Sequence, residues 1–120
     1  MEYACKLAGS KLIVVLGHSH CGAIIGACNH VELDHLSGLL HKIKPAVDAV
    51  ECQESDVVTG DNNYLVQKVA NKNVELNVQL IRMKSPLLTT MESNSEIAIV
   101  GAMYDIETGK VKFNSDLDIS

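Results

Sequence analysis

Two side chains that commonly bind zinc in proteins, His18 and Cys21, stand three residues apart in the sequence. An imidazole and a thiolate at this spacing, carried by a turn between a strand and a helix, can both reach one metal ion at about 2.0 to 2.3 Å. The start of a helix also favours the thiolate form of Cys21, which is the form that binds metal. The spacing alone is common by chance, and a capped turn with a buried thiol is the alternative interpretation.

The other histidines and cysteines offer weaker chemistry. His30, His35 and His41 are spaced by five and six residues, whereas one helix face requires three or four, so we expect solvated side chains. The remaining cysteines are expected to be reduced, inert thiols rather than disulfide partners: Cys5, Cys28 and Cys52. The sequence contains no glycine-rich phosphate loop and no Gly-x-Ser-x-Gly motif, so nucleotide binding and serine hydrolysis have no support.

The composition is that of one globular domain spanning residues 1–120. Hydrophobic residues make up 47% of the chain and charged residues 21%. The formal charge of −5 argues against general binding to nucleic acid or to an anionic membrane, because both require clustered Lys and Arg. No apolar run is long enough for a membrane span, and the first residues lack a secretory signal. We therefore expect a cytoplasmic protein with a small substrate.

Two apolar runs, residues 11–16 and 97–104, predict strands of a parallel sheet. Runs without polar alternation are typical of strands covered on both faces, which makes 11–16 a central strand. A turn then leads to a short final strand at 111–113. Ligands of α/β proteins gather beyond the carboxyl ends of such strands, and His18 and Cys21 follow the first strand directly.

Helices are expected between these strands, which gives an α/β fold with flanking helices. The first expected helix spans residues 1–8 and is ended by a left-handed Gly9, and a second begins at about residue 21. A third runs from about 33 to 50 and is kinked or restarted at Pro45, and a fourth, of about six turns, is capped by Asp61. A short fifth helix runs from Pro86 to about 91 and is capped by Ser85. A loop is expected at 51–60 and a frayed tail at 114–120.

Residues 11–23 resemble the G-H-[ST]-x-C-G-A signature of β-class carbonic anhydrases, including the hydrophobic strand before it. Further segments are similar to the same family in the same order: residues 2–4, 73–74, 85–87, 100–105 and 108–111. The resemblance implies a zinc ion, Zn2+, held by two cysteines and one histidine, which converts carbon dioxide and water to bicarbonate and a proton. It implies that His18 and Cys21 are zinc ligands and that Gly22 is the small residue beside the metal and substrate.

One motif of that family does not occur in this sequence. Family members carry a C-x-D-S-R motif ahead of the G-H-x-x-C segment, and it supplies the first zinc cysteine and an Asp-Arg pair that orients the fourth ligand. Cys5 is a poor substitute, and His20 is the more reachable additional ligand. We therefore expect a domain truncated at its N-terminus relative to the family, with half of the active site and little or no activity alone. The alternative is a non-catalytic binding or oligomerisation domain.

The resemblance also predicts self-assembly. In the family, the segment with the missing motif contributes a strand beside the one that residues 11–16 match. Without that neighbour the strand has an open edge, and it carries neither proline nor an internal charge to block pairing with another chain. We therefore expect a homodimer or higher oligomer in which the edge at 11–16 is buried.

Overall fold

The computed structural model of the chain describes residues 1–31 and 37–113. Its elements, in chain order, are α1 (Glu2–Lys6), β1 (Leu12–His18), α2 (Gly22–Cys28), α3 (Ser37–Glu54), α4 (Asn63–Lys84), α5 (Pro86–Ser93), β2 (Ala98–Tyr104) and β3 (Val111–Phe113). β1 and β2 are parallel, and β3 returns antiparallel to β2, which gives the sheet order β1-β2-β3. The predicted α/β class, with parallel strands, a short final strand and flanking helices, is confirmed.

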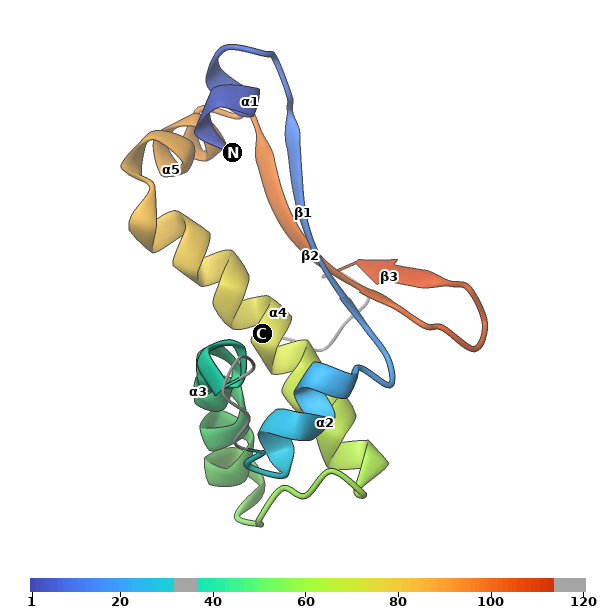
Figure 1. Cartoon of the computed structure of the whole chain (residues 1–120). Coiled ribbons are helices and arrows are strands. Elements are labelled where there is room, and N and C mark those ends of the chain that lie inside the picture. The colour runs from blue at the N-terminus through green and yellow to red at the C-terminus, as the bar shows by residue number, and fades with distance from the viewer. Residues whose placement is uncertain (32–36, 114–120) are drawn as a thin grey trace.

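The long helix α4 organises the molecule. Its 22 residues match the predicted six turns, and its apolar stripe is buried from Leu65 to Val78. In Figure 1, α4 runs beside the sheet, with α2 and α3 packed near its first half and α5 near its other end. Among the described residues, no helix is both long and apolar enough to cross a membrane.

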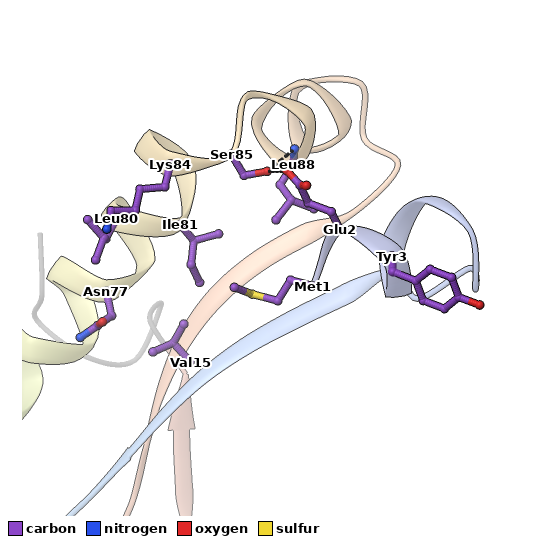
Figure 2. Close-up of a pocket in the computed structure, with 10 residues that line it drawn as sticks. All are labelled: Met1, Glu2, Tyr3, Val15, Asn77, Leu80, Ile81, Lys84, Ser85 and Leu88. Atoms are coloured by element: carbon purple, nitrogen blue, oxygen red, sulfur yellow. Dashed lines mark hydrogen bonds between the residues drawn. The ribbon is translucent and has the colours of Figure 1, made fainter. Parts of the chain in front are cut away.

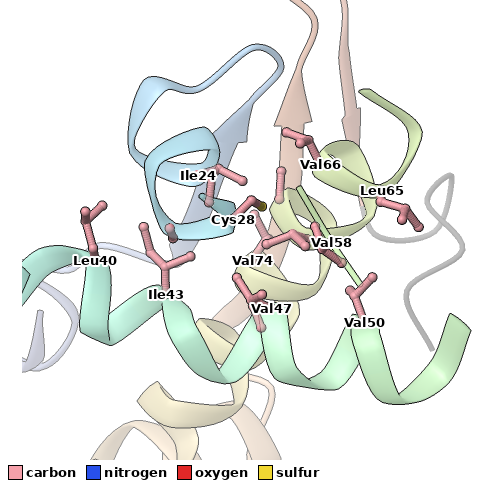
Figure 3. Packing of buried hydrophobic residues seen from close by; sticks show 14 of the residues in the cluster. Ile24, Cys28, Leu40, Ile43, Val47, Val50, Val58, Leu65, Val66 and Val74 are labelled. Atoms are coloured by element: carbon pink, nitrogen blue, oxygen red, sulfur yellow. The ribbon is translucent and has the colours of Figure 1, made fainter. Parts of the chain in front are cut away.

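Buried side chains form two clusters along α4. The first lies between α2, α3 and the first half of α4, and Figure 3 shows its aliphatic side chains meeting there with the Cys28 thiol. The second joins α1, α5, the start of β2 and Val78 of α4. Val15 of β1 packs against both clusters, so this strand position connects the two parts of the core.

Several predicted helix boundaries are confirmed. Gly9 follows α1 with φ +82°, in the left-handed region that favours glycine. The Ser85 side chain accepts a hydrogen bond of 3.2 Å from Leu88 N, and Pro86 takes the first position of α5. Residues 32–36, where the start of the third expected helix falls, and the expected frayed tail at 114–120 lie outside the described residues.

Other predictions about helices were wrong. The cap of α4 is Asn62, whose side chain accepts from Leu65 N, while the predicted cap Asp61 accepts a hydrogen bond from Thr59 Oγ1. α3 runs through Pro45 without a break and reaches Glu54, so the expected loop at 51–60 begins only after that residue. The apolar residues of α3 that follow Pro45 are buried in the first cluster, and this packing outweighs the backbone hydrogen bond that proline cannot donate.

The prediction that β1 is a central strand covered on both faces was also wrong. β2 is the central strand of the described sheet, and β1 lies at its edge. Leu12, Val14 and Leu16 are 55%, 41% and 58% exposed. Their exposure has a simple cause, since the helices cover only the other face of β1. Among the described residues, β1 pairs with β2 alone.

Candidate functional site

The candidate site begins where β1 ends. His18 is the last residue of β1, and Cys21 takes the N-cap position of α2 with φ −73° and ψ 120°. Between them, His20 adopts φ 53°, a left-handed conformation that reverses the chain sharply. The predicted strand, turn and helix are therefore confirmed, and they carry His18 and Cys21 at the carboxyl end of a parallel strand.

The turn is tied to the connection between β2 and β3. Ser19 N donates to the Tyr104 carbonyl oxygen over 2.9 Å, and Ser19 Oγ accepts from Ile106 N over 3.0 Å. His20 Nε2 lies 2.9 Å from Glu107 Oε1. The imidazole of His20, which sequence reasoning considered as an additional ligand, is thus paired with a carboxylate of the neighbouring turn.

His18 and Cys21 line one cavity of about 380 Å³. Its walls come from β1, α2, α3 and α4, and most of them are aliphatic, including Val15 and Val74. An imidazole and a thiol thus line the same largely apolar cavity, which is the usual character of a site for a small molecule.

Two local contacts fix how His18 is presented. Its Nδ1 donates to the Ser19 carbonyl oxygen over 2.9 Å, and this bond leaves the Nε2 lone pair available to a metal. The preceding residue, Gly17, allows close packing of β1 against α4. A Cβ at Gly17 would lie 2.8 Å from Val74 Cγ2 and 2.9 Å from Met103 Cε, so glycine is required for this approach.

The cavity also contains polar residues that sequence reasoning missed. They are Lys42 of α3 and two residues of α4, Asn73 and Asn77. Asn77 Nδ2 donates to the backbone oxygen of Asn73 over 2.7 Å and to its Oδ1 over 3.2 Å. The sequence did contain a signal for them, since two asparagines stand four residues apart beside the apolar stripe of α4. Polar side chains next to a buried stripe usually have hydrogen-bond partners or a function.

The remaining predicted candidates lie elsewhere. Gly22, the first residue of α2, is exposed and does not line the cavity, and a Cβ there would meet nothing within 4 Å. Cys5 is buried in the second cluster, among residues of α5 and β2. His30 and His41 are exposed, while His35 falls outside the described residues. Within residues 1–31 and 37–113, no group of three or more His, Cys, Asp or Glu side chains is arranged to hold a metal ion.

The donor set therefore fits zinc only in part. One imidazole nitrogen and one sulfur line the same cavity, whereas a zinc ion in a protein takes four ligands. The two side chains are the residue types that zinc prefers, and the second nitrogen of His18 is already held by a carbonyl oxygen, as is usual for a zinc-binding histidine.

Comparison with known proteins gives a consistent result. The sequence model of the carbonic anhydrase family matches residues 1–111. The chain is 29% identical over 112 residues to carbonic anhydrase 2 of Mycobacterium tuberculosis, covering 92% of this chain and 52% of that protein. It is 30% identical over 114 residues to carbonic anhydrase 1 of Escherichia coli O157:H7, covering 92% and 50%. The chain thus spans about half the length of these relatives.

Solved structures show the same fold. The β-carbonic anhydrase CcaA superposes with a TM-score of 0.80 at 24% identity, covering 94% of this chain and 55% of that one. A tetrameric β-carbonic anhydrase from Sordaria macrospora gives a TM-score of 0.80 at 28% identity, covering 94% and 56%. The likeness extends over nearly all of this chain and over little more than half of each neighbour.

Proposed function

This chain belongs to the β-class carbonic anhydrase family, and from that membership we propose that it takes part in the reversible hydration of carbon dioxide to bicarbonate, with His18 and Cys21 as zinc ligands. The observation that carries the proposal is that these two side chains, which match the family's G-H-x-x-C signature, line one cavity. The proposal places the protein in the cytoplasm.

The chain's own residues have distinct roles in this proposal. His18 offers Nε2 to the metal because its Nδ1 is bonded to the Ser19 carbonyl oxygen. Cys21 offers its thiolate from the N-cap of α2, whereas Gly22, expected beside the substrate, lies outside the cavity and has no role in the proposal. Zinc bound there would act as a Lewis acid and lower the pKa of a coordinated water towards neutrality. The aliphatic cavity wall suits carbon dioxide, which is apolar, and Lys42 supplies a positive charge for the bicarbonate anion.

The other two ligand positions are unassigned on the described residues, so the proposed site is half of a complete one. The 120-residue chain alone is expected to show little or no hydration of carbon dioxide, because catalytic zinc sites need three protein ligands and one open, oriented position. The zinc that it binds should be held more weakly than in a complete site. Binding should weaken as the pH falls, because Cys21 must lose its proton and His18 must be neutral.

Zinc binding with matched variants tests the proposal. Zinc per chain is measured after dialysis for the parent, for His18→Ala with Cys21→Ser, and for His30→Ala with Cys52→Ser, which changes the same residue types at exposed positions. We expect the first pair to abolish binding and the second to leave it unchanged. Equal binding by both double variants would show that the ligands lie elsewhere. Stopped-flow turnover comparable to that of a complete family member, lost in Cys21→Ser, would refute the half-site.

A second candidate function, an interaction domain without catalysis, is favoured by the open edge and exposed apolar face of β1. The same dialysis experiment separates the two proposals. Stoichiometric zinc that a chelator removes supports the enzyme family's function, whereas protein that never takes up zinc supports the interaction domain.

A further inference from the structure

Ser19 lies between the two proposed metal ligands and is held by a segment far from it in the sequence. Its backbone N donates to the carbonyl oxygen of Tyr104, the last residue of β2, over 2.9 Å. Its Oγ accepts from Ile106 N over 3.0 Å, and Ile106 stands 87 residues further along the chain. Ser19 is therefore fixed at two points by the end of β2 and by the turn that follows it.

The third polar group of Ser19 faces His18. The Ser19 carbonyl oxygen accepts from His18 Nδ1 over 2.9 Å. A carbonyl oxygen can only accept, so this bond requires the imidazole proton on Nδ1 and leaves the lone pair on Nε2. The direction of the Ser19 carbonyl thus determines both the tautomer and the orientation of the imidazole. That direction depends in turn on the two bonds that hold Ser19 to the end of β2 and the turn after it.

The turn between β2 and β3 has its own internal hydrogen bonds. Asp105 N donates to the Lys110 carbonyl oxygen and Gly109 N donates to the Asp105 carbonyl oxygen, each over 2.8 Å. The Asp105 carboxylate accepts from Glu107 N over 2.9 Å, and this bond lowers the pKa of Asp105 below its ordinary 3.8. Ile106 N is therefore presented from a turn whose backbone is bonded on both sides of it.

The conformation of the next residue explains why such an anchor is needed. His20 adopts φ 53°, in the left-handed region that is costly for a residue with a Cβ. Conformations of this kind persist where surrounding contacts determine them. The His20 imidazole also pairs with Glu107, but the two side chains are 47% and 71% exposed, so this pair adds little. The bonds to Ser19 are thus the main contacts that hold the sharp turn before Cys21.

Of the described residues, those that line the neighbouring cavity of about 720 Å³ provide no such anchor. This cavity shares Val15 and Asn77 with the site cavity, and Figure 2 shows Val15 on β1 facing Asn77 on α4. Among its described lining residues, Glu2 carries the one carboxylate, and it accepts a hydrogen bond from Ser85 Oγ. The anchoring of residues 18–20 therefore comes from the end of β2 and the turn after it.

We propose that Ser19 is a positioning residue of the site, which orients the His18 imidazole through its carbonyl oxygen and is itself held by the bond from Ile106 N to its Oγ. The inference rests on the proposed function, in which His18 and Cys21 bind zinc. The orientation of His18 nevertheless exists in the metal-free chain and can be measured there. Ser19 does not touch the metal in this arrangement. Loss of a contact that orients a metal-binding histidine typically lowers metal affinity about 10- to 100-fold.

The imidazole tautomer of His18 in the metal-free chain tests the positioning directly. Nitrogen-15 NMR at alkaline pH, where the imidazole is neutral, distinguishes a proton on Nδ1 from one on Nε2. We expect the Nδ1–H tautomer in the parent, a mixture of tautomers in Ser19→Ala, and the Nδ1–H tautomer again in Ser19→Thr, which keeps the hydroxyl. Ser93→Ala makes the same change at an exposed position of α5 and should match the parent. An Nδ1–H tautomer as complete in Ser19→Ala as in the parent would overturn the proposal.

Zinc affinity, measured by competition with a chelating dye, gives a second readout. Ser19→Ala should bind zinc at least about tenfold more weakly than the parent, whereas Ser19→Thr and Ser93→Ala should retain the parent's affinity. Loss of one hydrogen bond leaves the chain folded, and a purely structural effect would lower the urea midpoint without changing the affinity of the site.

The two proposals fail in different ways. Equal zinc affinity in the parent and in Ser19→Ala would overturn the positioning role, even where His18→Ala with Cys21→Ser abolishes binding and so supports the proposed function. A parent chain that binds no zinc would refute the proposed function, and the tautomers would then still decide whether Ser19 orients His18.

A substitution in the distant turn tests the route to His18. Asp105→Ala removes the carboxylate that accepts from Glu107 N, so Ile106 N should lose its fixed place. Zinc affinity should fall, as in Ser19→Ala. The double variant should bind about as weakly as Ser19→Ala alone, because both changes act through the same hydrogen bond. Strictly additive losses in the double variant would refute this route.

Discussion

Replacing Gly17 with alanine tests whether close packing of β1 against α4 sets the position of His18. The new Cβ would lie 2.8 Å from Val74 Cγ2 and 2.9 Å from Met103 Cε, closer than real Cβ atoms come to other atoms. The Met103 end can swing away because that side chain is flexible. Val74 is branched at Cβ and buried in the middle of α4, so β1 itself must shift away from the helix.

The expected cost can be estimated from overpacking. Inserting a methyl group into a well-packed site costs about 1–3 kcal/mol in the free energy of unfolding. Val74→Ala alone removes two buried carbons and should cost about 1.6 kcal/mol. In the Gly17→Ala chain, Val74→Ala also removes the close contact with the new Cβ. The loss in free energy of unfolding that Val74→Ala causes should therefore be smaller in that chain than in the parent, by about 1 kcal/mol or more.

Urea unfolding followed by circular dichroism measures all four chains of this cycle. They are compared at one protein concentration, because the unfolding midpoint of any chain that self-associates depends on concentration. Gly26→Ala is the matched control, since its Cβ would meet Leu40 at an ordinary 3.6 Å and alanine favours the helix, so it should be neutral or slightly stabilising. A Gly17→Ala chain as stable as the parent, or strictly additive effects in the cycle, would refute the packing argument.

Three further outcomes are expected. Burial raises the pKa of the Cys28 thiol to about 11. At pH 8 a thiol reagent should therefore modify the exposed Cys52 and leave Cys28 unmodified until the protein unfolds. Equal rates of modification at the two cysteines would contradict this. Hydrogen bonds from Arg82 hold the pKa of Glu92 below its ordinary 4.5, so the stability from this pair is present above that pH and is lost as the pH falls through the folded pKa. Glu92→Gln should therefore flatten the acid side of the pH profile of the urea midpoint, and an unchanged profile would count against it. Ser85→Ala removes the cap of α5 and should lower the free energy of unfolding by about 1 kcal/mol, which thermal unfolding measures against Ser85→Thr.

The elements themselves could be predicted from the sequence because apolar periodicity and local capping chemistry determine them. The pattern of α4 and the Ser85-Pro86 pair at the start of α5 are examples. The strand, turn and helix that carry His18 and Cys21 were predictable for a similar reason, since Gly17, the turn and the two side chains lie close together in the chain.

What escaped prediction depends on contacts between distant segments. Nothing in the run of apolar residues in β1 tells whether both faces are covered, because that depends on which helices pack on the sheet. The same holds for Lys42 and Asn73, which reach the cavity of His18 from two separate helices. His20 was considered as a ligand because it is close in sequence, whereas Glu107 binds it from the other end of the chain.

The division of the core into two clusters has a consequence for local unfolding. Of the described residues, the first cluster contains fifteen buried side chains and the second contains six, and Val15 packs against both. The smaller cluster should open at a lower free energy and expose α1, α5 and the start of β2 together, while α2, α3 and the first half of α4 stay closed. Native-state hydrogen exchange should therefore divide the amides of α4 near Val74, with slower exchange on the N-terminal side. The helix would then belong to two cooperative units, although its backbone is continuous.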